Sequence, residues 1–258
     1  MAQRRSLLPR EYGAYAELLF PLTTGLALGR PTAAAVLFAA AAVAWFLMHE
    51  PFAVLTGVRG ARAREILSAR ARARLRMLLG GGAVAGLAAV LFADPDARLA
   101  VLVPISCGVA LAPAVLRGRQ KTLGAEIVLI AALSGMVLPV GLAGGVEWSL
   151  AWLAAAVWFV SFVLGTVTVH GIKAAHKQTF GTRWTPYVPV VLAPMLVAIA
   201  ALAAAAGAVP PAIVAALLPS SVVAVVFSVL RVHPRRLRIV GWSLVTGNVV
   251  TLVILLAA

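Results

Sequence analysis

Long apolar stretches, separated by short polar gaps, fill almost the whole chain. Each stretch is about 20 residues long, which is the length of helix that crosses a bilayer core roughly 30 Å thick. The sequence therefore predicts an all-α, polytopic membrane helix bundle of about nine transmembrane helices, forming a single transmembrane domain over residues 1–258. The predicted spans are 12–29, 32–49, 77–93, 99–116, 122–143, 148–172, 186–206, 211–230 and 239–257.

Arg and Lys gather in alternate gaps between these predicted helices. The N-terminal segment and the second, fourth, sixth and eighth gaps hold nearly all of them, whereas Arg30 and Arg98 are the only basic residues in the other gaps. Cytoplasmic loops of membrane proteins carry the excess of basic residues. We therefore expect a cytoplasmic N-terminus and a multi-pass protein of the cell membrane, the inner membrane if the cell is bacterial.

Composition narrows the expected partners. The chain is 62% hydrophobic and carries a net charge of +14, from 22 Lys and Arg against 8 Asp and Glu. A strongly basic chain usually suggests nucleic acid. Here the basic residues lie in short loops beside apolar spans, where they face anionic lipid headgroups. Membrane lipids are therefore the expected partners, and nucleic acid is not.

The two longest gaps, 50–76 and 171–185, each follow a helix that ends in a histidine. In the first, His49 and Glu50 precede Pro51, which is expected to end or kink the helix and expose backbone carbonyls beside two titratable groups. In the second, His170 stands at the helix end. We interpret Glu50, His49 and His170 as candidate catalytic residues for phosphate binding or proton transfer. The alternative is a simple helix end at the headgroup level.

Basic side chains in the same two gaps suit an anionic head. Arginine is suited to bidentate contact with phosphate, so Arg59 and Arg62 are candidates within an Ala- and Arg-rich segment, expected to be a short amphipathic helix on the inner leaflet. Lys173 and Lys177 share one helix face with His170. The alternative role of all these cations is to contact lipid and fix the topology. No metal site is expected, since the histidines lack the i, i+4 spacing of helical metal pairs.

Three polar residues inside the predicted spans are expensive to place in a bilayer and need a reason. Glu17 is either an acid lining a cavity or an interfacial residue. Glu126 either lines a cavity or pairs with Lys121 near the helix end. Asn248 lies near the middle of the last span, where an interhelical hydrogen bond is expected. No nucleotide, hydrolase or zinc-protease motif is present, so the sequence leaves any cofactor unknown.

The opening segment, PREYGAYAELLFP at 9–21, resembles the N-terminal signature of the YwiC-like membrane proteins. That signature reads Pro, a basic residue, Glu or Gln, His, Gly, Ala and Trp, followed by an apolar run to a proline. This chain has Tyr12 in place of the usual His and Tyr15 in place of the usual Trp. The segment PRRLRIVGW at 234–242 is similar to the family's basic ending. The family carries no established activity, so the resemblance implies a membrane protein without naming its substrate.

The layout is also similar to that of the UbiA-type intramembrane prenyltransferases, which have nine helices and long cytoplasmic loops after helices two and six. In those enzymes Asp-rich motifs in the two loops hold Mg²⁺ and an isoprenoid diphosphate. The matching loops here contain only Glu50 and Glu65 as acids. The resemblance thus implies a UbiA-like arrangement with a lipid-accessible cavity, and it argues against the same metal chemistry.

Three functions compete on this evidence. The first is binding of an isoprenoid or other anionic lipid in a cavity open to the cytoplasm, with Glu50 as acid or base if turnover occurs. The head would then contact His49, Arg59, Arg62, His170, Lys173 and Lys177. The second is transport of a small amphipathic solute, with Glu17, Glu50 and Glu126 as coupling groups. The third is a non-catalytic component of a membrane assembly. Whether the protein is an enzyme is left open.

Overall fold

The computed structural model describes residues 7–8, 12–177, 185–230 and 232–257, and this part of the chain is almost entirely helical, without a β-strand. Two 3₁₀ helices, η1 (Thr185–Tyr187) and η2 (Pro234–Arg236), precede α9 and α11. The α-helices are α1 (Tyr12–Leu28), α2 (Ala33–Leu55), α3 (Ala61–Phe92), α4 (Pro95–Ala100), α5 (Leu102–Leu116), α6 (Leu123–Ser134), α7 (Val137–Ala143), α8 (Trp148–Lys177), α9 (Val188–Ala205), α10 (Pro211–Val229) and α11 (Leu237–Ala257).

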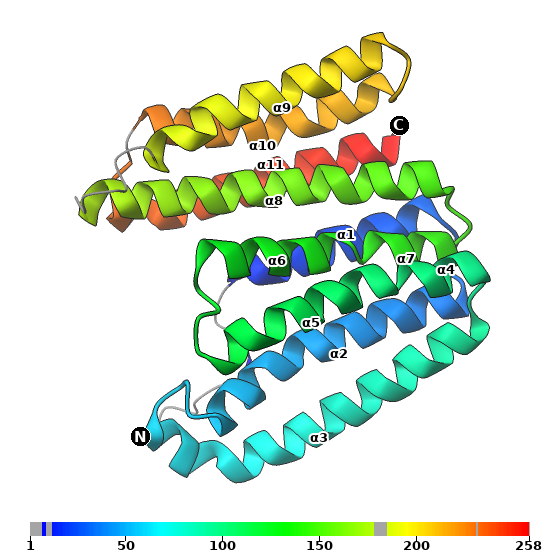
Figure 1. Ribbon diagram of the computed structural model, residues 1–258, viewed down its shortest axis with the longest axis vertical. Coiled ribbons are helices and arrows are strands. Elements are labelled where there is room, and N and C mark those ends of the chain that lie inside the picture. The colour runs from blue at the N-terminus through cyan, green and yellow to red at the C-terminus, as the bar shows by residue number, and fades with distance from the viewer. Residues whose placement is uncertain (1–6, 9–11, 178–184, 231, 258) are drawn as a thin grey trace.

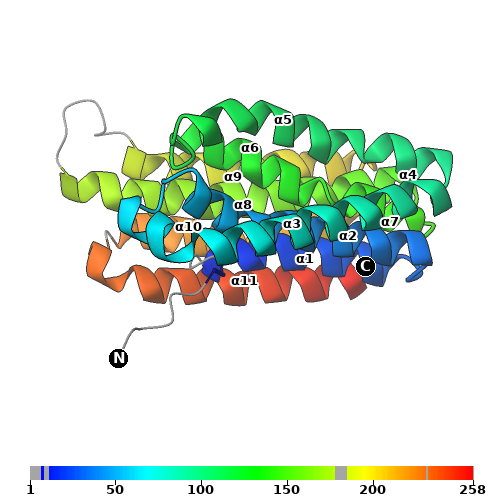
Figure 2. The same ribbon diagram turned by 90° about the horizontal axis from the view of Figure 1, so that it is seen from below.

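Eight helical stretches in the described residues are long and apolar enough to cross a membrane. Two of them combine consecutive helices, α4 with α5 (Pro95–Leu116) and α6 with α7 (Leu123–Ala143). The shorter α1, with 17 residues, lies in the bundle beside these eight stretches. The helices lie side by side along one common direction (Figures 1 and 2). The prediction of an all-α, multi-pass membrane bundle is confirmed.

The turns between helices alternate between the two ends of this bundle (Figure 1). The α2–α3, α5–α6 and α10–α11 turns lie at one end, at the left of the view, together with the last turn of α8. The α1–α2, α3–α4, α7–α8 and α9–α10 turns lie at the opposite end. Because the arginine-rich gaps fall in the first group, we call that end the basic end and the other the outer end. The positive-inside rule assigns the basic end to the cytoplasm.

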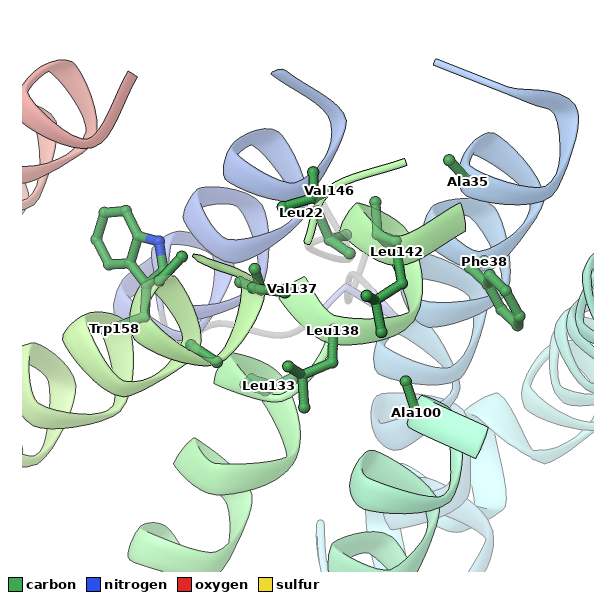
Figure 3. Close-up of a cluster of buried hydrophobic side chains, with 14 of the residues drawn as sticks. Leu22, Ala35, Phe38, Ala100, Leu133, Val137, Leu138, Leu142, Val146 and Trp158 are labelled. Atoms are coloured by element: carbon green, nitrogen blue, oxygen red, sulfur yellow. The ribbon is translucent and has the colours of Figure 1, made fainter. Parts of the chain in front are cut away.

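The main core lies where α1, α6, α7 and α8 meet, and Figure 3 shows part of it around Val137, Leu138 and Trp158. Trp158 is fully buried and stacks on Phe20 and Phe162, with ring centroids 5.3 and 5.4 Å apart. Its indole N–H donates to Thr24 Oγ1 at 2.9 Å, and the Thr24 hydroxyl donates to the Phe20 carbonyl at 2.9 Å. Both polar groups are thus paired inside the bundle, as a bilayer without water requires.

Two turns at the outer end pack backbone against backbone. The Arg30 amide donates to the Gly144 carbonyl at 2.8 Å, and the Thr32 hydroxyl donates to the Ala143 carbonyl at 2.7 Å. A Cβ atom added to Gly144 would lie 2.8 Å from the Arg30 oxygen. Glycine is therefore required for the α1–α2 and α7–α8 turns to approach this closely. We call this contact the outer clasp.

Two helices at the basic end are longer than predicted. Pro51 does not end α2, which continues to Leu55. Pro51 has no N–H to donate, so α2 gives up one backbone hydrogen bond there and still continues for one more turn. The arginine-rich segment is not a separate helix on the leaflet, because it is the first half of α3. With 32 residues α3 is about 48 Å long, so its basic half extends past a hydrocarbon core of roughly 30 Å.

Candidate functional site

Glu50, the first predicted catalytic residue, forms a buried ion pair with Arg59. Its side chain is 6% exposed, near the end of α2, whereas that of Arg59 is 32% exposed. The turn between them folds back so that the Arg59 amide donates to the Ala53 carbonyl at 3.2 Å. Gly57 and Gly60 have φ values of +81° and +89°, which glycine adopts without strain. The turn therefore delivers a guanidinium to the buried carboxylate.

His49, the neighbour of Glu50 on α2, points to a different partner. Its Nε2 lies 3.3 Å from Oε1 of Gln120, in the turn between α5 and α6. The contact is exposed to solvent. It joins the basic ends of α2 and the α5–α6 hairpin. The partner of His49 is therefore a neutral amide.

His170 pairs with Glu126, and this contact joins α8 to α6. The imidazole Nε2 lies 2.7 Å from Glu126 Oε2, with side chains 26% and 32% exposed. Glu126 lies in the first turn of α6, which begins where the Thr122 hydroxyl accepts a hydrogen bond from the Ala125 amide. A carboxylate beside an imidazole is able to orient the ring and exchange a proton with it.

Together these contacts form three polar pairs at the basic end: Glu50–Arg59, His49–Gln120 and Glu126–His170. They join the α2–α3 turn, α2, the α5–α6 hairpin and α8 in a row. The sequence predicted His49, Glu50 and His170 as one polar site. The structure brings all three to the same end, and each contacts its own protein partner.

The remaining predicted residues are more dispersed. Arg62 and Lys173 are exposed on α3 and α8, and Lys177 is the last residue of α8, its side chain outside the described part. Glu17 is half-buried in the second turn of α1. Asn248 is buried in α11, and its Oδ1 has no hydrogen-bond partner among the described residues.

Metal ligands do not cluster in the described residues. No three His, Cys, Asp or Glu side chains there stand close enough to hold a metal ion together. The side chain of His176 lies outside the described part of the chain.

A lateral groove between α10 and α11 was not predicted from the sequence. It has a volume of about 840 Å³ and a mostly apolar lining. From α10 it is lined by Leu218 and Val222, and from α11 by Arg238, Trp242, Thr246 and Val250, among others. The α11 residues recur every four positions, which places them on one helix face. That spacing was visible in the sequence, but its apolar partner on α10 was not.

A second hollow, of about 930 Å³, lies at the α2–α3 corner of the basic end. One wall is formed by Leu55 and Gly57, and the other by the first turns of α3. We call it the basic crevice, since Arg64 and Arg72 line it. Neither hollow is lined by Glu17, Glu50, Glu126 or the two histidines of the polar pairs.

These features define a multi-pass α-helical membrane protein with polar pairs at one end, a lateral groove and a basic crevice. The sequence profile described as YwiC-like protein matches residues 8–141, just over half of the chain, from the start of α1 to within α7. The chain therefore belongs to the YwiC-like family. No curated protein and no solved structure matches it. The α10–α11 groove lies outside the matched segment and the basic crevice lies inside it.

Proposed function

We propose that this protein binds a lipid that has a long apolar chain and an anionic head, in the cell membrane and from its cytoplasmic leaflet. The chain lies in the α10–α11 groove and the head meets Arg238. The observation that carries the proposal is the groove itself, which is mostly apolar and has an arginine among its lining residues, in the first turn of α11.

The dimensions of the groove support a lipid chain. Arg238 and Val250 lie twelve residues apart on α11, which is about 18 Å along the helix axis. One leaflet of the hydrocarbon core is roughly 15 Å thick. A groove that faces the bilayer with Leu218, Val222 and Val250 therefore spans the depth of one leaflet. Its volume of about 840 Å³ lies in the usual range for small-molecule sites.

The end of the groove at α11's first turn suits an anionic head. Arg238 is exposed there, and Arg235 and Arg236 are exposed just before it. A guanidinium makes two parallel hydrogen bonds to a phosphate or carboxylate. Trp242, one turn deeper, lies where interfacial tryptophans gather. The α8 helix, which carries the predicted head-binding Lys173, contacts η2 beside this cluster.

An isoprenoid with an acidic head is one lipid of this description, and an anionic phospholipid is another. The head group is assigned to Arg238 because Arg59, the predicted candidate, already pairs with Glu50. The UbiA-like arrangement expected from the loop layout remains a prediction. Likewise, a catalytic role for Glu50, His49 or His170 remains a prediction that this binding site does not need.

Native mass spectrometry of the purified full chain, with identification of retained lipid, tests the proposal. Arg238→Gln should lose the retained lipid, while Arg70→Gln, at an exposed position on α3, should keep it, since both remove one positive charge and only Arg238 lines the groove. Val222→Trp should displace the chain without any change of charge. Equal retention in all three variants and the wild type would overturn the proposal.

A further inference from the structure

The basic crevice collects groups that attract an anion on one face of α3. Arg64, Ser68 and Arg72 line it at intervals of four residues, so they form a single stripe along the helix. The two arginines lie about 12 Å apart along the axis, with the serine hydroxyl halfway between them. Within the described part of the chain, neither guanidinium takes part in a salt bridge. Two guanidinium groups without a salt-bridge partner among the described residues thus line one hollow.

The start of α3 adds to this attraction. Ala61, the first residue of the helix, lines the crevice, and Gly60 at the N-cap provides no side-chain hydrogen bond. The first amides of a helix carry a partial positive charge and bind anions when no side chain caps them. The arginine stripe and the uncapped helix start are independent features, and both border the same hollow.

The wall opposite α3 is fixed by the Glu50–Arg59 pair. Arg59 is held by Glu50, and its amide is tied to Ala53. The turn that provides Gly57 to the crevice is therefore closed before any ligand arrives. A preformed hollow does not need to order its own walls on binding, which reduces the entropy lost.

We propose that the basic crevice binds a phosphate group. Arg64 and Arg72 hold the phosphate, and the Ser68 hydroxyl donates a hydrogen bond to it. The phosphate belongs either to the headgroup of a phospholipid in the adjoining leaflet or to a phosphate ester from solution. This site is distinct from the α10–α11 groove, since α3 and α10 lie on opposite sides of the bundle (Figure 1). It does not depend on the function proposed above.

The acidic residue Glu65 allows a test of whether the ligand of the basic crevice is negatively charged. It lines the same crevice with the opposite charge and forms no salt bridge within the described residues. Its carboxylate repels a bound phosphate, and solvent and salt screen part of this repulsion. Glu65→Gln should therefore tighten phosphate binding, while loss of either arginine weakens it.

The first experiment titrates inorganic phosphate into the full chain in detergent, with chloride at matched ionic strength as the reference, and measures the shift in unfolding temperature. Arg64→Gln and Arg72→Gln should each raise the apparent Kd about tenfold, the usual weight of a hydrogen bond to a charged group. Arg62→Gln is the matched control, because it removes an equal charge from the same helix outside the crevice. It should leave the Kd unchanged.

The second arm places the chain in phosphatidylcholine nanodiscs with or without phosphatidic acid. Stabilisation by phosphatidic acid alone, lost in Arg64→Gln and Arg72→Gln, identifies a lipid headgroup as the source. Stabilisation by inorganic phosphate as well identifies a soluble phosphate ester. If Arg62→Gln behaves like Arg64→Gln and Arg72→Gln in both arms, or if neither probe stabilises the wild type, the proposal is wrong. The inorganic-phosphate arm separates this result from the test of the groove, because Arg238 lies outside the crevice and Arg238→Gln should leave that Kd unchanged.

Discussion

The Glu50–Arg59 pair predicts an asymmetric response to two substitutions that each remove one charge. Arg59→Gln leaves a carboxylate that is 6% exposed without its counter-ion, whereas Glu50→Gln leaves a guanidinium that is 32% exposed and reaches water. The cost of breaking an ion pair is set by the charge that stays behind. Arg59→Gln should therefore be the more damaging change, although the same interaction is lost in both.

The expected magnitudes follow from this burial. Leaving one member of a buried pair alone costs roughly 3–5 kcal/mol, and the partly exposed geometry here favours the low end, about 3 kcal/mol for Arg59→Gln. Glu50→Gln keeps an oxygen that accepts a hydrogen bond from Arg59, so its cost should be about 1 kcal/mol. Arg62→Gln, a change at an exposed arginine in the first turn of α3, should cost well under about 0.5 kcal/mol.

Unfolding by SDS in mixed micelles, followed through the fluorescence of the six tryptophans, measures these differences. The reasoning requires the order Arg59→Gln, then Glu50→Gln, then Arg62→Gln. If Glu50→Gln proves as damaging as Arg59→Gln, the carboxylate is not held mainly by Arg59. If neither variant differs from Arg62→Gln, the pair does not stabilise the turn, and a role for Glu50 in chemistry gains support.

Two further predictions concern packing. Gly144→Ala should destabilise the bundle by roughly 1–3 kcal/mol, because its Cβ would meet the backbone of the outer clasp. Gly80→Ala is the control, because Gly80 faces open space on α3. It should be neutral or stabilising in the same SDS titration. Thr24→Val keeps the side-chain shape but leaves the Trp158 N–H unpaired, at a cost of about 1 kcal/mol. In a Trp158→Phe background, Thr24→Val should cost little, because no indole N–H is left unpaired. Strictly additive costs of the two substitutions would contradict the hydrogen bond.

Most of the fold could be predicted because a bilayer allows few solutions. Runs of about 20 apolar residues cross it as helices, and the arginines mark one side. The errors fell where the chain leaves the membrane. The helix α2 passes Pro51, and α3 begins sixteen residues before its predicted span, because Ala and Arg are both good helix formers in water and lipid alike.

The candidate site was harder to predict, because its contacts depend on how separate helices are placed against each other. Glu126 and His170 are 44 residues apart in the chain, and only the relative heights of α6 and α8 bring them together. Glu50 and Arg59 had a local signal, since the glycines at 57 and 60 mark a tight turn between them. To predict the basic crevice, one would have to know both that the arginine-rich segment continues α3 and which path the turn before it takes.

The outer clasp has a mechanical consequence for the whole molecule. The helices α2 and α8 both begin beside it, where backbone meets backbone, and both end at side-chain pairs that are partly open to water. Their outer ends are therefore joined through the backbone and their basic ends through polar side chains. The helix α2, with 23 residues, is about 35 Å long. A tilt of about 5° around the clasp moves its far end by about 3 Å. Tilting about the clasp thus displaces the basic end most, and the α2–α3 corner, closed by the Glu50–Arg59 pair, moves as one unit with its crevice.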